Sequence, residues 1–260
     1  METVRSADGT QIAFRRSGSG PPLVLVHGST ADHTRWAGVL PDLERAFTVI
    51  AMDRRGRGAS GDGDHYALER EFEDVAAVVG AAGSKVDLVG HSFGALCALE
   101  AALRAENLRR LVLYEPVFPV GDAPLYPPAL RDRLWALVQA GDRETALTSF
   151  FRDVVGLPET QIAALRADPS WKSRIASVHT AIRELADGDY RFRADRFGGL
   201  NLPVLLLVGE KSPKPLRAPS TVLAAALADA RISEMRGQGH IAMTTAPDLF
   251  LSEITGFLSA

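Results

Sequence analysis

Short apolar runs alternate with longer amphipathic segments along most of the chain, and this alternation carries the strongest structural signal. Runs of four or five mainly apolar residues occur at 23–26, 48–52, 86–89, 111–114 and 204–208. Such runs are typical of strands that are buried on both faces of a parallel sheet. The segments between them have the 3.6-residue apolar spacing of helices, at 36–45, 69–82, 95–105 and 221–227. The alternation predicts an α/β architecture with a mostly parallel sheet flanked by helices.

Both ends of the chain add elements to this pattern. Asp8-Gly9 separates two alternating segments, 3–5 and 11–15, which is typical of a β-hairpin. Near the other end we expect a short strand over 231–235 and a last amphipathic helix over 249–258.

The stretch from 118 to 199 interrupts the alternation, because it has helical spacing but no buried-strand run. Several prolines mark its entry and Gly198-Gly199 marks its exit. Helical spacing is present at 128–140, 143–155, 159–167 and 171–186. We interpret 118–199 as a helical cap inserted over the carboxyl edge of the sheet, with a core formed by 1–117 and 200–260.

Composition and charge exclude several classes of protein. The chain has 260 residues and a net charge of −3, so it lacks the basic surface that nucleic-acid binding requires. No apolar run approaches the ~18 residues of a membrane span, and the polar, alternating N-terminus is unlike a signal peptide. The single cysteine, Cys97, has no partner for an internal disulfide. We therefore expect a cytoplasmic protein with neither nucleic-acid nor membrane partners.

The strongest chemical signal is Gly90-His91-Ser92-Phe93-Gly94, which follows the apolar run 86–89 and precedes a helical segment. A serine on a sharp strand-to-helix turn exposes its hydroxyl at the carboxyl edge of a sheet. Glycines on either side remove the Cβ atoms that would clash in so tight a turn. The pattern of five residues is common by chance, but its position between a strand and a helix indicates a nucleophile.

A serine hydroxyl needs a neighbouring base, and His240 in a Gly-rich loop near the C-terminus is the candidate. Fixed N–H donors must also stabilise the oxyanion that forms on attack. We expect these donors to be the backbone amides of Phe93 and Ser29. Ser29 lies in the turn after the run 23–26, where Gly28 lets the backbone approach the substrate closely.

Four ordered motifs make the chain similar to α/β-hydrolase fold enzymes over nearly its whole length outside the insertion. They are Val26-His27-Gly28, the segment Asp53 to Ser60, Gly90 to Gly94, and Gly239-His240. The resemblance implies an α/β-hydrolase fold, with a structural role for the Asp53 segment. The histidines lack metal-ligand spacing and no nucleotide-binding loop is present, so neither a metal nor another cofactor is expected.

The chain departs from this family at the acid of its catalytic triad. The family usually carries an aspartate three residues after a glycine that follows the strand here at 204–208, but this chain has Ser212 there. Glu115 follows the run 111–114, which the family's strand order places beside the Ser92 strand. Some family members, among them certain lactonases and dehalogenases, carry their acid at that place. Glu115 is our candidate acid, while Glu210 and a Ser–His pair without an acid stay open as alternatives.

These residues predict a serine hydrolase that cleaves a small ester or lactone through an acyl-enzyme intermediate. Thioester or carbon–carbon bond hydrolysis, acyl transfer and perhydrolysis would use the same serine and histidine, and a non-catalytic binder is a further alternative. Aromatic side chains in the insertion favour an apolar or aromatic substrate. We expect Trp135 and Phe151 to contact it together with Gly28, although packing between inserted helices is an alternative role for the two aromatic residues.

Overall fold

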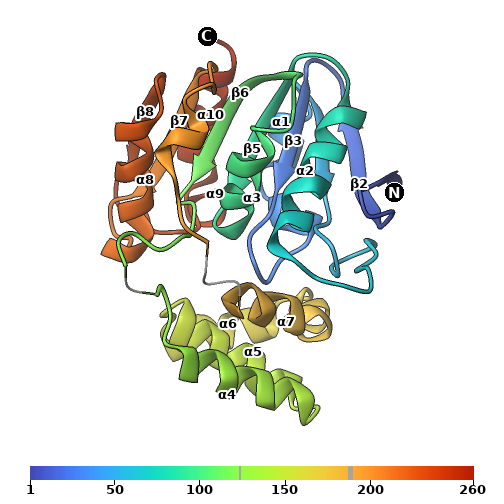
Figure 1. Ribbon diagram of the computed structural model, residues 1–260, viewed down its shortest axis with the longest axis vertical. Coiled ribbons are helices and arrows are strands. Elements are labelled where there is room, and N and C mark those ends of the chain that lie inside the picture. Colours follow the sequence, from blue (N-terminus) through green and yellow to red (C-terminus); the bar gives the residue numbers. More distant parts are fainter. Residues whose placement is uncertain (123, 187–189) are drawn as a thin grey trace.

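The computed structural model describes residues 1–122, 124–186 and 190–260, and its centre is an eight-stranded sheet. The strand order is β1-β2-β4-β3-β5-β6-β7-β8. The first two strands pair antiparallel, β2 also runs antiparallel to β4, and every pairing from β4 to β8 is parallel (Figure 1). The predicted mostly parallel sheet with flanking helices is confirmed.

The strands coincide with the predicted hairpin and apolar runs. Those at the centre of the sheet are buried along their length, because helices cover both faces and continuous apolar sequence is then favourable. The strands are β1 Glu2–Arg5, β2 Gln11–Gly18, β3 Pro22–Val26, β4 Thr48–Met52, β5 Val86–His91, β6 Leu108–Tyr114, β7 Val204–Gly209 and β8 Ala230–Met235.

Helices pack apolar side chains against each face of the sheet. One face is covered by α2 (Leu68–Ala82), α3 (Phe93–Ala101) and α8 (Lys214–Ala226). The other face is covered by η1 (His33–Trp36), α1 (Leu40–Leu43), α9 (Ala242–Thr245) and α10 (Pro247–Leu258). Within the described parts of the chain, no helix has both the length and the apolar character needed to cross a membrane.

One predicted helix is wrong in extent. Instead of a continuous helix over 36–45, the chain forms the 3₁₀ turn η1 and the single-turn α1. Gly38 and Pro41 explain the break, since glycine weakens a helix and proline, which has no N–H to donate to a preceding turn, suits the first turn of a new helix.

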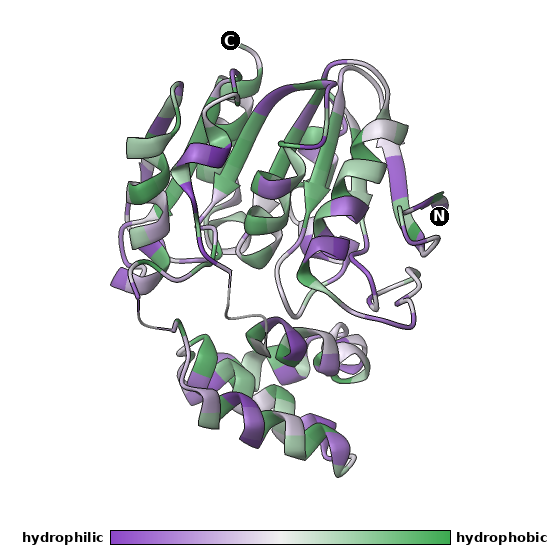
Figure 2. Ribbon diagram, in the orientation of Figure 1, coloured by the Kyte–Doolittle hydropathy of each residue, from purple (hydrophilic) through white to green (hydrophobic). Residues whose placement is uncertain are grey.

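Four helices form a second layer that lies across the carboxyl ends of the parallel strands (Figure 1). They are α4 (Pro128–Gln139), α5 (Arg143–Ser149), α6 (Glu159–Ala167) and α7 (Trp171–Ala186), and a π-helical turn, η2 (Phe150–Val154), continues α5. We call α4–α7 the cap helices. They enclose an apolar cluster of their own, and Figure 2 shows polar residues alternating with apolar ones along them.

A buried cluster of charges joins the cap helices to the core. Arg54, which follows β4, bonds Glu71 of α2 at 3.1 Å and Glu184 of α7 at 2.6 Å. Arg57 also bonds Glu184, and all four side chains are almost completely buried. The positive charges of two guanidinium groups are therefore neutralised by two carboxylates in a region that water does not reach. Removing one member of such a set leaves a buried charge uncompensated.

We predict that Glu184→Gln lowers the free energy of unfolding by about 3 kcal/mol, because Arg54 and Arg57 then share a single carboxylate. Urea denaturation followed by circular dichroism measures this change. The matched control is Glu159→Gln, also in the cap helices, whose partner Arg152 and own side chain are both exposed. Its cost should stay within about 1 kcal/mol. Equal losses in the two variants would show that the buried cluster does not anchor the cap helices.

Candidate active site

Ser92 lies at the sharp turn between β5 and α3, in a backbone conformation that few residues other than glycine adopt. Its φ is +58°, and α3 begins at the next residue. A Cβ on Gly94 would lie 2.2 Å from the carbonyl oxygen of His27, so the turn packs directly on the loop that follows β3. A non-glycine residue with positive φ costs about 1–3 kcal/mol and is concentrated at functional sites.

The turn after β3, residues 27–30, lies against Ser92 and is called the oxyanion turn below. A Cβ on Gly28 would lie 3.0 Å from the Ser92 Cβ, so a side chain here would force its neighbours to shift by a few tenths of an ångström. The amides of Ser29 and Phe93 have no hydrogen-bond acceptor among the residues that the structure describes. Arg57 Nε donates to the Ser29 carbonyl at 2.9 Å and fixes the orientation of the turn. Both amides are therefore available to an oxyanion at Ser92.

The structure brings Glu115 and His240 into direct contact. Nδ1 of His240 lies 2.5 Å from Oε2 of Glu115, and Oε1 of the same carboxylate accepts a 2.7 Å bond from the amide of Gly209. Glu115 is completely buried and, like Ser92, has a positive φ, of +45°. It follows β6, the strand beside β5, so its position after the neighbouring strand is what brings it to the imidazole.

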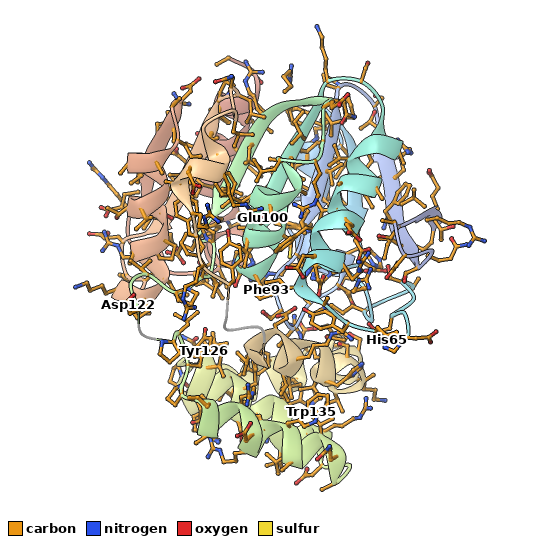
Figure 3. The ribbon with its side chains drawn as sticks, in the orientation of Figure 1. His65, Phe93, Glu100, Asp122, Tyr126 and Trp135 are labelled. Atoms are coloured by element: carbon orange, nitrogen blue, oxygen red, sulfur yellow. The ribbon has the colours of Figure 1, made fainter. Side chains whose placement is uncertain are left out.

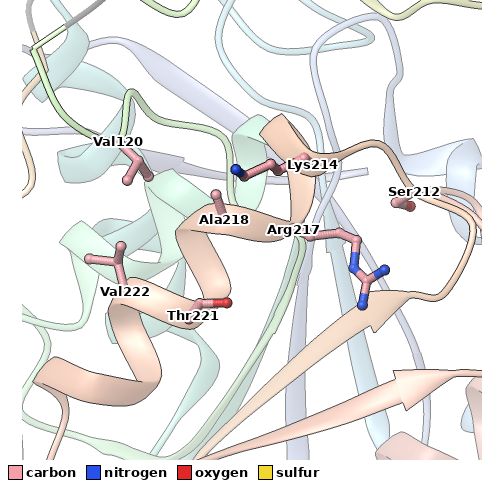
Figure 4. Close-up of a pocket in the computed structure, with 7 residues that line it drawn as sticks. All are labelled: Val120, Ser212, Lys214, Arg217, Ala218, Thr221 and Val222. Carbon is pink, nitrogen blue, oxygen red and sulfur yellow. The ribbon is translucent and has the colours of Figure 1, made fainter.

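The two other positions considered for the acid, residues 210 and 212, make different contacts. Glu210 is exposed, and its Oε2 accepts a 2.6 Å bond from the amide of Gly237. Ser212 is buried, and within the described chain its Oγ has no hydrogen-bond partner. Ser212 lines a hollow of about 410 Å³ between α8 and Val120, together with Lys214 and Arg217 (Figure 4). No residue of the oxyanion turn lines this hollow.

Two polar side chains of the sheet hold the loop that carries His240. His91 Nε2 donates to the His240 carbonyl at 2.7 Å, and the two rings pack against each other at a tilt of 42° with centroids 4.6 Å apart. The Tyr114 hydroxyl donates to the Gly239 carbonyl and accepts from the Ala242 amide at 3.2 Å. Because His91 directly precedes Ser92, this ring contact places the His240 ring beside the nucleophile turn. Sequence analysis missed the roles of Tyr114 and Arg57; a hydroxyl ending the apolar run 111–114 was a signal for the first.

The aromatic residues expected to contact substrate have different surroundings. Phe151 is buried in the apolar cluster of the cap helices and stacks on Trp171 at 6.1 Å. Trp135 is 39% exposed on α4, and Figure 3 shows it well separated from Phe93. Packing within the cap helices accounts for Phe151, so contact of either residue with substrate stays a prediction.

One cluster of described residues has the composition of a metal site. Asp32, His33 and Asp53 each offer a ligand atom, and these atoms lie within 4.8 Å of one another. However, Oδ1 of Asp53 accepts from the amide and Nδ1 of His33, and Oδ2 accepts from the Ala59 amide at 2.9 Å. The carboxylate thus acts as a hydrogen-bond acceptor that shapes the loop, and this fits the structural role expected for the Asp53 segment.

Comparisons with known proteins agree with this geometry. The sequence model of the alpha/beta hydrolase family matches residues 23–253. A 2-hydroxy-6-oxo-2,4-heptadienoate hydrolase from Pseudomonas putida is 32% identical over 192 residues, which cover 68% of this chain and 67% of the relative. Among solved structures, an alpha/beta hydrolase from Sphaerobacter thermophilus is 39% identical, with a TM-score of 0.86 over 99% of this chain and 100% of the other. The esterase RhEst1 from a Rhodococcus species is 28% identical, with a TM-score of 0.78 over 100% and 98% of the two chains.

Burial, reinforced by the neighbouring His240, holds the pKa of His91 well below its usual value of 6.5, so the folded protein keeps this ring neutral. The unfolded chain takes up a proton on the same residue as the pH falls below 6.5. The stability that neutral His91 confers is therefore fully present above pH 6.5 and is lost at lower pH. We predict that, as the pH falls below 6.5, the unaltered protein loses unfolding free energy more steeply than His91→Gln does, by a difference in slope that rises to about 1.4 kcal/mol per pH unit.

Urea denaturation at a series of pH values measures these slopes. His65→Gln is the matched control, since His65 is exposed and should leave the slope unchanged. Identical slopes in His91→Gln and the unaltered protein would mean that His91 is not held neutral in the fold.

Proposed function

Because the chain belongs to the alpha/beta hydrolase family, we propose that it is a serine hydrolase that cleaves a carboxylic ester or lactone. Ser92 is the nucleophile, His240 the general base and Glu115 the acid that orients the imidazole. The amides of Ser29 and Phe93 form the oxyanion hole. The observation that carries the proposal is the buried contact between His240 and Glu115 beside a serine held at positive φ.

The reaction proceeds in two halves. His240 takes the Ser92 proton on Nε2 while Nδ1–H stays bonded to Glu115, and the serine oxygen attacks the carbonyl carbon. The two amides stabilise the negative oxygen, and each such donor contributes about 3–4 kcal/mol to lowering the barrier. His240 then passes its proton to the leaving oxygen, which departs as an alcohol. In the second half His240 deprotonates water, which attacks the acyl carbon and releases the acid and Ser92.

The Rhodococcus esterase supports the choice of an ester, since it aligns over the whole of this chain. The substrate that we propose is small and has an apolar or aromatic acyl part. The Phe93 ring at the nucleophile turn supports this choice. Gly28, Trp135 and Phe151 are the proposed contacts.

Hydrolysis of a carbon–carbon bond is the second candidate function. The Pseudomonas putida relative is named for an oxo acid rather than for an ester. The same serine, histidine and oxyanion hole would serve that reaction, with a carbon leaving group protonated in place of oxygen. Parallel assays with p-nitrophenyl esters and with an oxo-dienoate of that kind distinguish the two.

We predict that a fluorophosphonate probe labels the protein and that p-nitrophenyl acetate is hydrolysed with a burst of p-nitrophenol. Ser92→Ala should abolish both signals, because the probe reacts only with an activated serine. Intact-mass spectrometry measures the labelling. The matched control is Ser84→Ala, a change of an exposed serine in the loop before β5, which should label fully. Absence of labelling in the folded, unaltered protein would instead favour a non-catalytic binder.

A second prediction concerns the acid. Glu115→Gln should lower kcat by about 10³- to 10⁴-fold, because an amide cannot stabilise the imidazolium and favours the wrong tautomer. Glu210→Gln keeps an oxygen that can accept the Gly237 bond, so we expect kcat within about twofold of the unaltered value. Steady-state kinetics with p-nitrophenyl acetate measure both. A large loss in Glu210→Gln with little loss in Glu115→Gln would reverse the assignment.

The position of Ser212 offers a test by rescue. A Cβ on Gly239, the neighbour of His240, would lie 3.9 Å from the Ser212 Oγ. We therefore expect Ser212→Asp to restore part of the activity lost in Glu115→Ala. Rescue would show that Glu115→Ala loses activity because the carboxylate is missing and not because the protein unfolds. Circular dichroism checks independently that both variants are folded.

A further inference from the structure

Arg35 and Arg174 are half-buried and, unlike the fully buried arginines, have no ion-pair partner among the described residues. Arg35 belongs to η1, shortly after the oxyanion turn, and its Nη2 donates to Sδ of Met243 at 3.4 Å. Arg174 of α7 donates from Nη1 to the Thr30 carbonyl at 2.7 Å and from Nε to the Ser170 Oγ at 3.0 Å. No carboxylate oxygen of the described chain lies within 4.0 Å of either guanidinium. By contrast, the buried Arg54, Arg55 and Arg57 are all ion-paired.

The environment of these two arginines is unfavourable for positive charge. Burial, with a further contribution from the charge of Arg174, lowers the pKa of Arg35 to about 10. Burial also lowers the pKa of Arg174. The charges of Asp32 and Asp168 partly offset this, since both act on Arg174 and Asp168 also acts on Arg35. Neither is in ion-pair contact with a guanidinium: Asp32 accepts from Thr34 and Ser173, and Asp168 accepts from Ser170. Two half-buried cations without a carboxylate in direct contact would be stabilised by an anion bonded to both.

Both arginines lie next to the proposed catalytic groups. Thr30, which Arg174 bonds, directly follows Ser29 of the oxyanion hole. Met243, which Arg35 contacts, belongs to α9, the short helix after His240. The charge of Arg35 also acts on His91 and Tyr114, the two side chains that hold the His240 loop. The pair therefore flanks the catalytic centre, with one guanidinium from the core and one from the cap helices.

We propose that Arg35 and Arg174 form a binding site for a carboxylate on the substrate, so that the enzyme prefers esters or lactones bearing an acidic group remote from the scissile bond. This inference rests on the proposed ester or lactone hydrolysis. Guanidinium groups suit this role because each presents several N–H donors to a carboxylate and stays charged at neutral pH. The apolar acyl part would lie between the carboxylate and Ser92. Arg174, which comes from α7, would close the cap helices onto an acidic substrate.

The test compares two esters that differ only at the end of the acyl chain. Mono-4-nitrophenyl adipate has a terminal carboxylate where 4-nitrophenyl hexanoate has a methyl group. We expect the unaltered protein to have a kcat/KM about tenfold or more higher for the adipate ester. In Arg35→Gln and in Arg174→Gln, the ratio of the two kcat/KM values should fall by about ten- to a hundredfold, mainly through KM. Arg35→Lys should retain part of the preference because it retains the charge.

Arg5→Gln is the matched control, since it removes one positive charge from an exposed residue of β1 and should leave the ratio unchanged. Equal kcat/KM values for the two esters in the unaltered protein would overturn the inference. So would equal losses on both esters in the arginine variants, which would assign these residues a structural role.

A binding measurement separates this inference from the proposed function. Titration calorimetry of Ser92→Ala with adipate should show binding that Arg35→Gln in the same background removes. If neither ester is hydrolysed but adipate binds through Arg35, the proposed function fails and the carboxylate site stands. If the hexanoate ester is hydrolysed and adipate does not bind, the carboxylate site fails and the proposed function stands.

Discussion

The arrangement of the site depends on a carboxylate that is completely removed from water. Burying the Glu115 side chain is costly unless its oxygens are hydrogen-bonded, and the structure supplies an imidazole to one and the Gly209 amide to the other. The positive φ of Glu115 is the local strain that directs the side chain there. This single contact fixes the tautomer of His240, since Nδ1 must carry the proton that faces the carboxylate. The other ring nitrogen is then free to accept the Ser92 proton in the proposed reaction.

Sheet topology explains why a carboxylate after β6 can replace one after β7. The two strands are adjacent and parallel, so their carboxyl ends lie ~4.8 Å apart. The same position of the His240 loop is therefore within reach of either strand end. Glu115 bonds the Gly209 amide at the end of β7, so it spans the gap between the strands. With the proposed acid directly after β6, residue 212 needs no charge, and a buried serine can line the hollow beside α8.

The sequence predicted most of the sheet because buried parallel strands have a distinctive apolar pattern, and it predicted the nucleophile turn because its glycines are sterically required. The pairing of Glu115 with His240 was reached only through the strand order of a similar family, since residues 125 positions apart carry no local signal of contact. The break at Gly38 and Pro41 was missed because apolar spacing outweighed two helix-breaking residues. The functions of Tyr114 and Arg57 depend on carbonyl groups in distant loops, which no pattern of side chains encodes.

The buried charges of the protein fall into two kinds, and the difference bears on how the cap helices cooperate with the core. Arg54 and Arg57 are neutralised by Glu71 and Glu184, and Arg57 also orients the oxyanion turn. The charges of that cluster are balanced by its own members, so it stabilises the observed position of α7 whether or not a ligand is present. Arg35 and Arg174 lie at the same boundary without a carboxylate in ion-pair contact among the described residues, although Asp32 and Asp168 partly offset their charge. In the proposed carboxylate site, an anionic ligand bonded to both guanidinium groups would add a contact between α7 and the core.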